Sequence, residues 1–153
     1  MISMVGGSQT AETREMMESC QPEAGRSKGT IVFPRGLVGC ENWRRFTLED
    51  DPEGGPVKLL QCLDEPDVGL LVVDPSLIVA DYQVDLSSAD VRELALRDES
   101  EAAVYCTLTV HQSPTRITAN LLGPLVINVR AGLGKQLVLA NSNYSVRHPV
   151  PLE

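Results

Sequence analysis

The sequence predicts a mostly β protein, folded as a small antiparallel β-barrel with one short helix near residues 87–97. Three observations support this prediction. Short runs of β-branched and apolar residues recur between residues 30 and 140, with turn residues between them at intervals too short for βαβ units. The run from Val104 to Val110 alternates with period two, and residues 87–97 carry the one credible helix start signal. Closure into a barrel would also remove exposed strand edges.

Turn residues divide the first half of this region into short strands. We expect strands at residues 30–33, 45–49, 57–63 and 69–74 and, with weaker alternation, at residues 82–86. A proline ends the first run, the Asp-Asp-Pro-Glu-Gly-Gly-Pro segment forms a loop before the third, and Asp-Glu-Pro-Asp forms a turn before the fourth.

The predicted helix begins with a capping signal. Ser87 is expected to accept a hydrogen bond from the main chain of the first turn, and Asp90, three residues later, completes a short capping box. Leu86 and Val91 can form the accompanying hydrophobic staple. We expect the helix to end near Arg97.

The second half of the region contains the clearest strand, residues 104–110, whose four apolar side chains fall on one face and predict a central position. Residues 117–121 and 125–129 flank a Gly-Pro turn, and we expect these two strands to pair with each other. Residues 135–140 are a continuous apolar run after a Gly-containing turn, as expected of a further core strand.

Four polar residues in these runs are candidate partner-binding residues. Asn120 and Asn128 interrupt apolar runs, where an amide is disfavoured unless its hydrogen bonds are met. We interpret both as residues that hydrogen-bond their own turns, with direct contact to a partner as the alternative. Gln61 and Tyr82 lie on predicted strands, where polar side chains serve either as cross-strand partners or as part of a recognition surface.

The length of 153 residues suits one domain that buries about two thirds of its unfolded surface. Residues 1–29 contain no Leu, Phe, Tyr or Trp, so we predict a disordered or frayed N-terminal extension followed by a single domain at residues 30–153. No apolar run reaches the length of a secretory signal or a membrane span, and we expect a soluble cytoplasmic protein.

The four cysteines do not predict a metal site. None forms a C-x-x-C pair, and only two histidines are present to complete a ligand set, whereas a structural zinc site needs four ligands with two usually close in sequence. We therefore expect reduced thiols, no metal and no cofactor.

Acidic residues are concentrated in the middle third of the chain. Residues 49–101 hold fifteen acids and three bases, a net charge of −12, whereas the whole chain carries −8. A solvated face is one interpretation, and a docking surface for a basic protein is the other. Under the second, the predicted contacts are the acids of two loops, with exposed strand edges receiving a second partner: Asp50, Asp51, Asp64, Glu65 and Asp67. Nucleic acid is disfavoured as a ligand because Lys and Arg are not clustered and aromatic residues make up only 4%.

The sequence contains no complete catalytic motif. The segment Gly132-Leu133-Gly134-Lys135 lacks the glycine and the Ser or Thr that a phosphate-binding loop requires at the neighbouring positions. His111 has no serine in a G-x-S-x-G elbow to activate. We predict a non-enzymatic protein. The alternative is a barrel that binds a carbohydrate or another small molecule in a pocket lined by its few aromatic residues.

Several motifs, in one order along the chain, resemble the FliW family of bacterial flagellar assembly factors. The matching segments run from about Thr30 to Pro149 and are Phe33-Pro34-Arg35-Gly36-Leu37-Val38-Gly39, Leu60-Gln61-Cys62, Val72-Val73-Asp74-Pro75, Asp81-Tyr82, Asn120-Leu121-Leu122-Gly123-Pro124-Leu125-Val126-Ile127-Asn128, Gly134-Lys135-Gln136-Leu137-Val138-Leu139, Tyr144 and Arg147-His148-Pro149. Cys40 replaces a usual aromatic and Gly123 a usual alanine, which affects local packing.

This resemblance implies a regulator built on a small β-barrel that acts by binding proteins. Members of the family bind flagellin in the cytoplasm and also bind CsrA, a basic RNA-binding dimer that represses flagellin translation. Binding of the two partners is mutually exclusive, so free flagellin releases CsrA. The resemblance therefore implies flagellin and CsrA as partners, with no direct contact to nucleic acid or membrane. If electrostatic steering guides CsrA to an acidic surface, that binding should weaken as salt rises.

Overall fold

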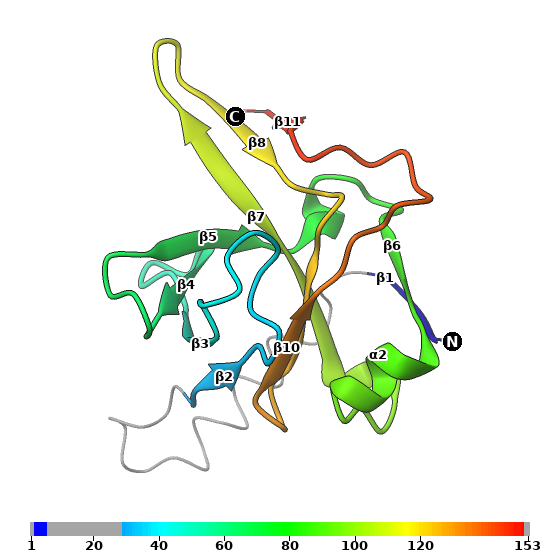
Figure 1. Ribbon diagram of the computed structural model, residues 1–153. Coiled ribbons are helices and arrows are strands. Elements are labelled where there is room, and N and C mark those ends of the chain that lie inside the picture. The colour runs from blue at the N-terminus through cyan, green and yellow to red at the C-terminus, as the bar shows by residue number, and fades with distance from the viewer. Residues whose placement is uncertain (1, 6–28, 152–153) are drawn as a thin grey trace.

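The structure, a computed structural model, describes residues 2–5 and 29–151. In this part of the chain seven strands close into a barrel, which confirms the predicted fold class (Figure 1). In order around the barrel they are β7 (Ala102–His111), β5 (Gly69–Val73), β4 (Lys58–Cys62), β3 (Arg45–Glu49), β2 (Ile31–Val32), β10 (Leu133–Gln136) and β9 (Leu125–Asn128), which pairs with β7 again. The pairs are antiparallel except for β2 with β10, which run parallel.

The long strand β7 joins the barrel to a projecting hairpin. Its first half pairs with β9, its middle with β5, and its last four residues with β8 (Arg116–Ala119). A short strand, β11 (His148–Val150), adds to the outer edge of β8. Figure 1 shows this three-stranded extension standing away from the barrel. The central position predicted for residues 104–110 is confirmed.

Two predictions about the second half were wrong. Residues 117–121 and 125–129 do not pair with each other, because β8 pairs with β7 and β11 whereas β9 pairs with β10 and β7. The Asn120 side chain is the local reason: its Oδ1 accepts hydrogen bonds from the main-chain N–H groups of Leu122 and Gly123, and this turn carries the chain across the barrel. The strand predicted at residues 135–140 also lies earlier than expected, at Leu133–Gln136. Beyond it, the main-chain N–H groups of Leu137 and Leu139 donate to the carbonyl oxygens of Pro124 and Leu122.

The helix α2 (Ser88–Glu93) has the predicted capping box. The Ser87 hydroxyl accepts from the Asp90 N–H, and the Asp90 carboxylate accepts from the Ser87 N–H. The helix is shorter than predicted because Ala95 adopts a φ of 53°, in the left-handed region that ends a helix. Two turns of 3₁₀-helix flank it in sequence, η2 (Pro75–Leu77) and η3 (Glu99–Glu101).

Part of the predicted N-terminal extension is a strand. Ile2–Val5 form β1, which pairs antiparallel with β6 (Gln83–Leu86), so the prediction of a frayed segment is wrong for these four residues. The remainder of that prediction, residues 6–28, lies outside the described residues.

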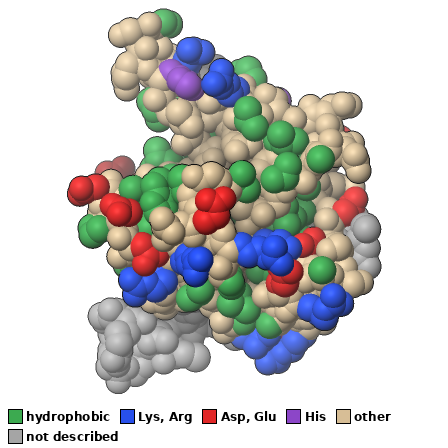
Figure 2. All heavy atoms as spheres, viewed as in Figure 1, with side chains coloured by type: hydrophobic (Ala, Val, Ile, Leu, Met, Phe, Trp, Pro, Cys, Tyr) green, Lys and Arg blue, Asp and Glu red, His purple; other side chains and the backbone are tan. Residues whose placement is uncertain are grey.

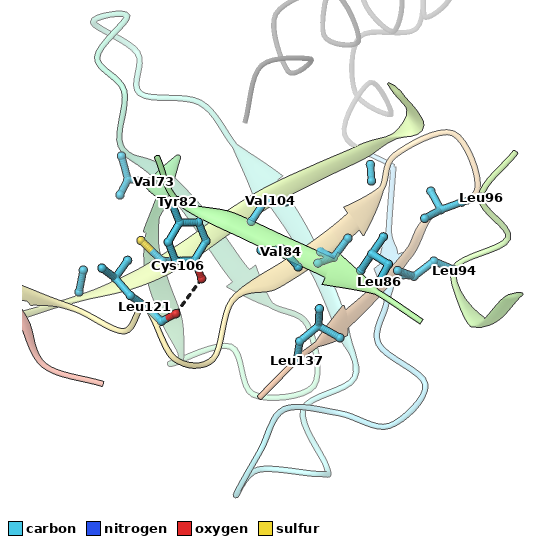
Figure 3. Close-up of a cluster of buried hydrophobic side chains, with 13 residues drawn as sticks. Val73, Tyr82, Val84, Leu86, Leu94, Leu96, Val104, Cys106, Leu121 and Leu137 are labelled. Carbon is cyan, nitrogen blue, oxygen red and sulfur yellow. Dashed lines mark hydrogen bonds between the residues drawn. The ribbon is translucent and has the colours of Figure 1, made fainter. Parts of the chain in front are cut away.

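Two apolar cores occupy the two faces of the barrel wall. Inside the barrel lie side chains such as Phe33, Phe46, Leu60, Val72, Tyr105 and Ile127. Outside it, a second core is covered by α2, β6 and the segments after β8 and β10, and it contains Tyr82, Val84, Leu86, Leu94, Val104, Cys106, Leu121 and Leu137 (Figure 3). Successive residues of β7 alternate between the two cores, so this strand is buried on both faces up to Cys106.

Candidate partner-binding surface

The acids of the loop between β3 and β4 are engaged within the fold. Asp50 forms an ion pair with Lys58 at 2.5 Å, and the Lys58 side chain is only 10% exposed. Asp51 accepts hydrogen bonds from the main-chain N–H groups of Glu53 and Gly55 and so shapes the loop. Neither carboxylate is a simple exposed charge, although Asp50 lies on the surface.

The loop between β4 and β5 separates one structural acid from two exposed ones. Asp64 Oδ2 accepts from the main-chain N–H groups of Arg44 and Arg45, both at 2.8 Å, and Oδ1 pairs with the Arg45 guanidinium at 3.0 Å. These main-chain hydrogen bonds, with the Arg45 charge, hold the pKa of Asp64 below its usual value. Glu65 and Asp67 are exposed, and no ion pair to either is found among the described residues. They are the predicted acids most available to a partner.

Gln61 holds the turn between β4 and β5 together. Its Nε2 donates to the carbonyl oxygens of Cys62, Pro66 and Val68 at 2.9–3.1 Å. These hydrogen bonds stabilise the turn and hold the loop that carries Glu65 and Asp67 in a defined conformation.

Tyr82 and Asn128 are fully buried, so neither side chain presents a surface to a partner in this structure. The Tyr82 hydroxyl donates to the carbonyl oxygen of Leu121 at 2.7 Å (Figure 3). Asn128 Nδ2 donates to the carbonyl oxygens of Leu94 and Ala95 at the end of α2, and its Oδ1 accepts from the N–H of Ala131. The amide of Asn128 thus joins its own turn to the helix. Asn120, half-buried, shapes the turn after β8 as described above.

A charged network lies between α2 and β10. Lys135 pairs with Asp90 at 2.5 Å and with Glu93 at 2.8 Å, and Arg35 pairs with Glu93 at 2.9 Å. Burial raises the pKa of Asp90, but the hydrogen bonds from Lys135 and Ser87 outweigh it, and the pKa lies below its usual value. The four charged side chains of this network therefore pair with one another.

A pocket of about 200 Å³ lies beside this network. It is lined by Pro34, Arg35, Glu93, Gly134 and Lys135, with no aromatic ring among these residues. A carbohydrate site is expected to offer aromatic faces together with free polar groups, and here the polar groups already pair with each other. The pocket therefore gives no support to the small-molecule alternative.

Apolar side chains that the sequence analysis did not single out form an uncovered part of the outer barrel wall. Leu59 on β4 pairs with Leu71 on β5, which pairs with Leu108 on β7. Val110 follows two residues later on β7 and pairs with Ile117 on β8. Leu71 and Val110 are 39% and 43% exposed. We call these five residues the open sheet face.

Charged side chains are unevenly distributed over the surface. Figure 2 shows acidic side chains gathered at the left edge of the view, over the loops between β3, β4 and β5, and Lys, Arg and His side chains at the top, over the projecting extension. The extension contributes His111, Arg116 and His148, at or beside paired positions of β7, β8 and β11. Part of the acidic middle third of the sequence thus lies at one end of the molecule, and the basic side chains of the extension lie at another.

Other candidate sites are not formed in the described part of the chain. No three His, Cys, Asp or Glu side chains come together there as metal ligands. His111 Nε2 lies 3.1 Å from the Thr118 hydroxyl, a cross-strand polar contact. Among the described helices, none has the length and apolar character needed to cross a membrane.

The described residues form a small closed β-barrel whose polar candidate residues mostly hydrogen-bond within turns or the core. Its surface carries exposed acids and the open sheet face. A model of the FliW protein family matches residues 17–150. The chain is 36% identical over 121 residues to the flagellar assembly factor FliW of Clostridium botulinum (strain Alaska E43 / Type E3), which covers 79% of this chain and 86% of that protein. It is 38% identical over 119 residues to the FliW of Moorella thermoacetica, covering 77% and 75% of the two chains. The chain belongs to the FliW family of flagellar assembly factors.

The fold agrees with this assignment. A crystal structure of the flagellar assembly factor FliW superimposes with a TM-score of 0.74 at 33% identity, covering 81% of this chain and 86% of that one. The resemblance identified from sequence motifs is therefore confirmed, including the mostly β barrel with one short α-helix.

Proposed function

We propose that this protein controls flagellin production in the cytoplasm by binding two proteins, flagellin and the translational regulator CsrA, in a mutually exclusive manner. It antagonises CsrA while flagellin is scarce and releases CsrA as free flagellin accumulates. The protein acts by holding its partners and catalyses no reaction. Membership of the flagellar assembly factor family is the observation that carries this proposal.

The charge distribution supports a basic partner. Glu65 and Asp67 are exposed in a loop that Gln61 and Asp64 hold in place, so their charges keep a defined position. Clustered charge of one sign attracts a partner of opposite sign during diffusion, and it raises the association rate more than the final affinity. CsrA binding should therefore slow with rising salt.

Strand edges are the surface that we propose for flagellin. Barrel closure leaves unpaired edges on β11, β1 and β6 in the described part of the chain. Pro149 at the centre of β11 has no N–H to offer an added strand, which makes that edge a poor template. The β1–β6 ladder is the better site for an extended flagellin segment.

Purified protein titrated with CsrA, with flagellin, and with both together tests the proposal. We expect each partner to bind alone, flagellin to displace CsrA, and CsrA association to slow between about 50 and 500 mM salt because surface charges are screened. Failure of the wild-type chain to bind either partner would refute the proposal, as would a ternary complex. Equal association rates at all salt concentrations would refute the electrostatic part alone.

Charge reversal identifies the acids involved. Glu65→Lys with Asp67→Lys should reduce the CsrA association rate several-fold. The matched control, Asp81→Lys with Glu99→Lys, changes the net charge equally at exposed positions outside this loop. An equal loss in both variants would show that overall charge, and not the loop between β4 and β5, governs binding.

A further inference from the structure

The open sheet face is an apolar surface of the barrel that extends from the outer core. Leu71 lies two residues before Val73 on β5, and Leu108 lies two residues after Cys106 on β7, so each pair shares one face of its strand. Val73 and Cys106 are buried in the outer core. Farther along the same strands the cover ends, and Leu71 and Val110 become exposed.

Register places the apolar side chains side by side. Leu59, Leu71 and Leu108 are directly opposed on three neighbouring strands, and directly opposed residues lie on the same face about 5 Å apart. Val110 and Ile117 extend the face onto β8. Leu71 and Val110 are exposed, and contiguous exposed apolar residues are a feature of protein interaction sites.

Acidic groups border one side of this face. Glu49 on β3 is directly opposed to Leu59, so it stands at the end of the leucine row. The β4–β5 loop, with the exposed Glu65 and Asp67, joins two of the strands that form the face. The nearby guanidinium of Arg45 is already paired with Asp64. The border is therefore negatively charged next to an apolar centre.

We propose that the open sheet face receives the basic RNA-binding regulator, through an apolar stripe on that partner flanked by Lys or Arg side chains. This inference rests on the proposed function. Protein interfaces combine an apolar centre that supplies most of the affinity with a polar border that supplies specificity and association rate. Here the leucine row forms the centre, and Glu49, Glu65 and Asp67 form the border.

The test is a lysine placed at the centre of the face. Leu71→Lys and Val110→Lys change side chains that are partly in water, and each would meet a basic partner with a like charge. We expect at least about a ten-fold rise in the Kd for CsrA for each variant. Val38→Lys is the matched control, since Val38 is 63% exposed and its main chain is bonded to Gln136 on β10, outside the open face.

The apolar centre and the acidic border should affect different rate constants of CsrA binding. Centre variants should raise the dissociation rate, whereas the Glu65 and Asp67 reversals should lower the association rate. If a lysine variant no longer shows a thermal unfolding transition, the double variant Leu71→Ala with Val110→Ala replaces it, because it adds no charge. This double variant should also weaken CsrA binding. Wild-type affinity in all these variants would refute the inference alone. Absence of CsrA binding by the wild-type chain would refute the proposed function and the inference with it.

Discussion

The hydroxyl of Tyr82 donates a 2.7 Å hydrogen bond to the carbonyl oxygen of Leu121, inside a core where both residues are fully buried. The bond joins the start of β6 to the segment that follows β8, 39 residues away in sequence. Burial raises the pKa of the Tyr82 phenol, so the group stays protonated and remains a donor. A residue that resembled a recognition element in the sequence is a structural link between two layers.

Tyr82→Phe should therefore lower the free energy of unfolding by about 1–2 kcal/mol, because the buried carbonyl of Leu121 loses its hydroxyl donor. Urea titration of both proteins measures the difference. Tyr144→Phe is the control: that ring is half-buried and its hydroxyl has only a long 3.4 Å contact with the Gln83 N–H, so the loss should stay below about 0.5 kcal/mol. Equal losses in the two variants would contradict the role given to the Tyr82 hydroxyl.

Asn128 makes the second buried polar link, between β9 and the end of α2. Asn128→Ala leaves the buried carbonyl oxygen of Leu94 without its donor, whereas the Ala95 carbonyl keeps the Arg130 guanidinium, so we expect a loss of about 2–3 kcal/mol. Asn120→Ala removes bonds within one half-buried turn and should cost about 1 kcal/mol. Thermal unfolding of both variants ranks them. The reverse order would mean that the turn, and not the helix attachment, depends most on an asparagine.

Elements defined by neighbouring residues were predictable from the sequence. The bounds of β3 agree with prediction, and the capping box of Ser87 and Asp90 is present, because turn residues and caps act over three or four positions. Asn120 also bonds its own turn as interpreted. FliW motifs added the fold as a whole, since the spacing of many local signals is specific even where each is weak.

Pairings between distant segments were not predictable in the same way. The sequence places two strands either side of Gly123-Pro124, but only the barrel shows that β8 joins β7 and β11 while β9 closes the wall. Leu71 on β5 is 39% exposed because the cover of the outer core ends before it, and the extent of that cover depends on distant segments. Among the five acids taken as one docking surface, Asp51 and Asp64 shape the main chain, a distinction that needs the positions of N–H groups.

The ion pairs of Lys135 should make stability depend on acid pH. The Lys135 hydrogen bond holds the pKa of Glu93 below its usual value, and the pKa of Asp90 is also lowered. A carboxyl group whose pKa is lower in the folded state stabilises the fold above its unfolded pKa of about 4, and this contribution is lost as pH falls through the folded value. Lys135→Met should therefore flatten the decline of Tm between about pH 5 and pH 2.

Arg35→Met provides the control for this measurement. Its ion pair with Glu93 is more exposed, with the Arg35 side chain 72% in water, so its removal should change the acid decline less than Lys135→Met does. A Tm profile of Lys135→Met parallel to the wild type would show that Asp64, Glu101 and other carboxylates with lowered pKa values account for the acid sensitivity.

The buried thiol of Cys106 should affect the alkaline side. Burial raises its pKa to about 12, and the Asp74 carboxylate adds to the rise. A group whose pKa is higher in the folded state stabilises the fold fully below its unfolded pKa of about 8.5, and this contribution is lost as pH rises toward the folded value. Cys106→Ala should have a flatter Tm profile than the wild type between about pH 9 and pH 11, whatever its stability at neutral pH. Parallel profiles would exclude the thiol as a source of alkaline sensitivity.

Gly134 lets β10 pass close to the aromatic centre of the barrel. A Cβ at this position would lie 2.5 Å from Cζ of Phe33. The Phe33 ring is fully buried and packs edge-on against the Phe46 ring, with 5.3 Å between the ring centroids. The ring has no exposed side toward which to move, so Gly134→Ala should cost about 1–3 kcal/mol by overpacking. Gly29→Ala is the control, since no heavy atom lies within 4 Å of its Cβ position. Urea titration distinguishes them, and a Gly134→Ala protein as stable as Gly29→Ala would mean that β10 can move away from the ring.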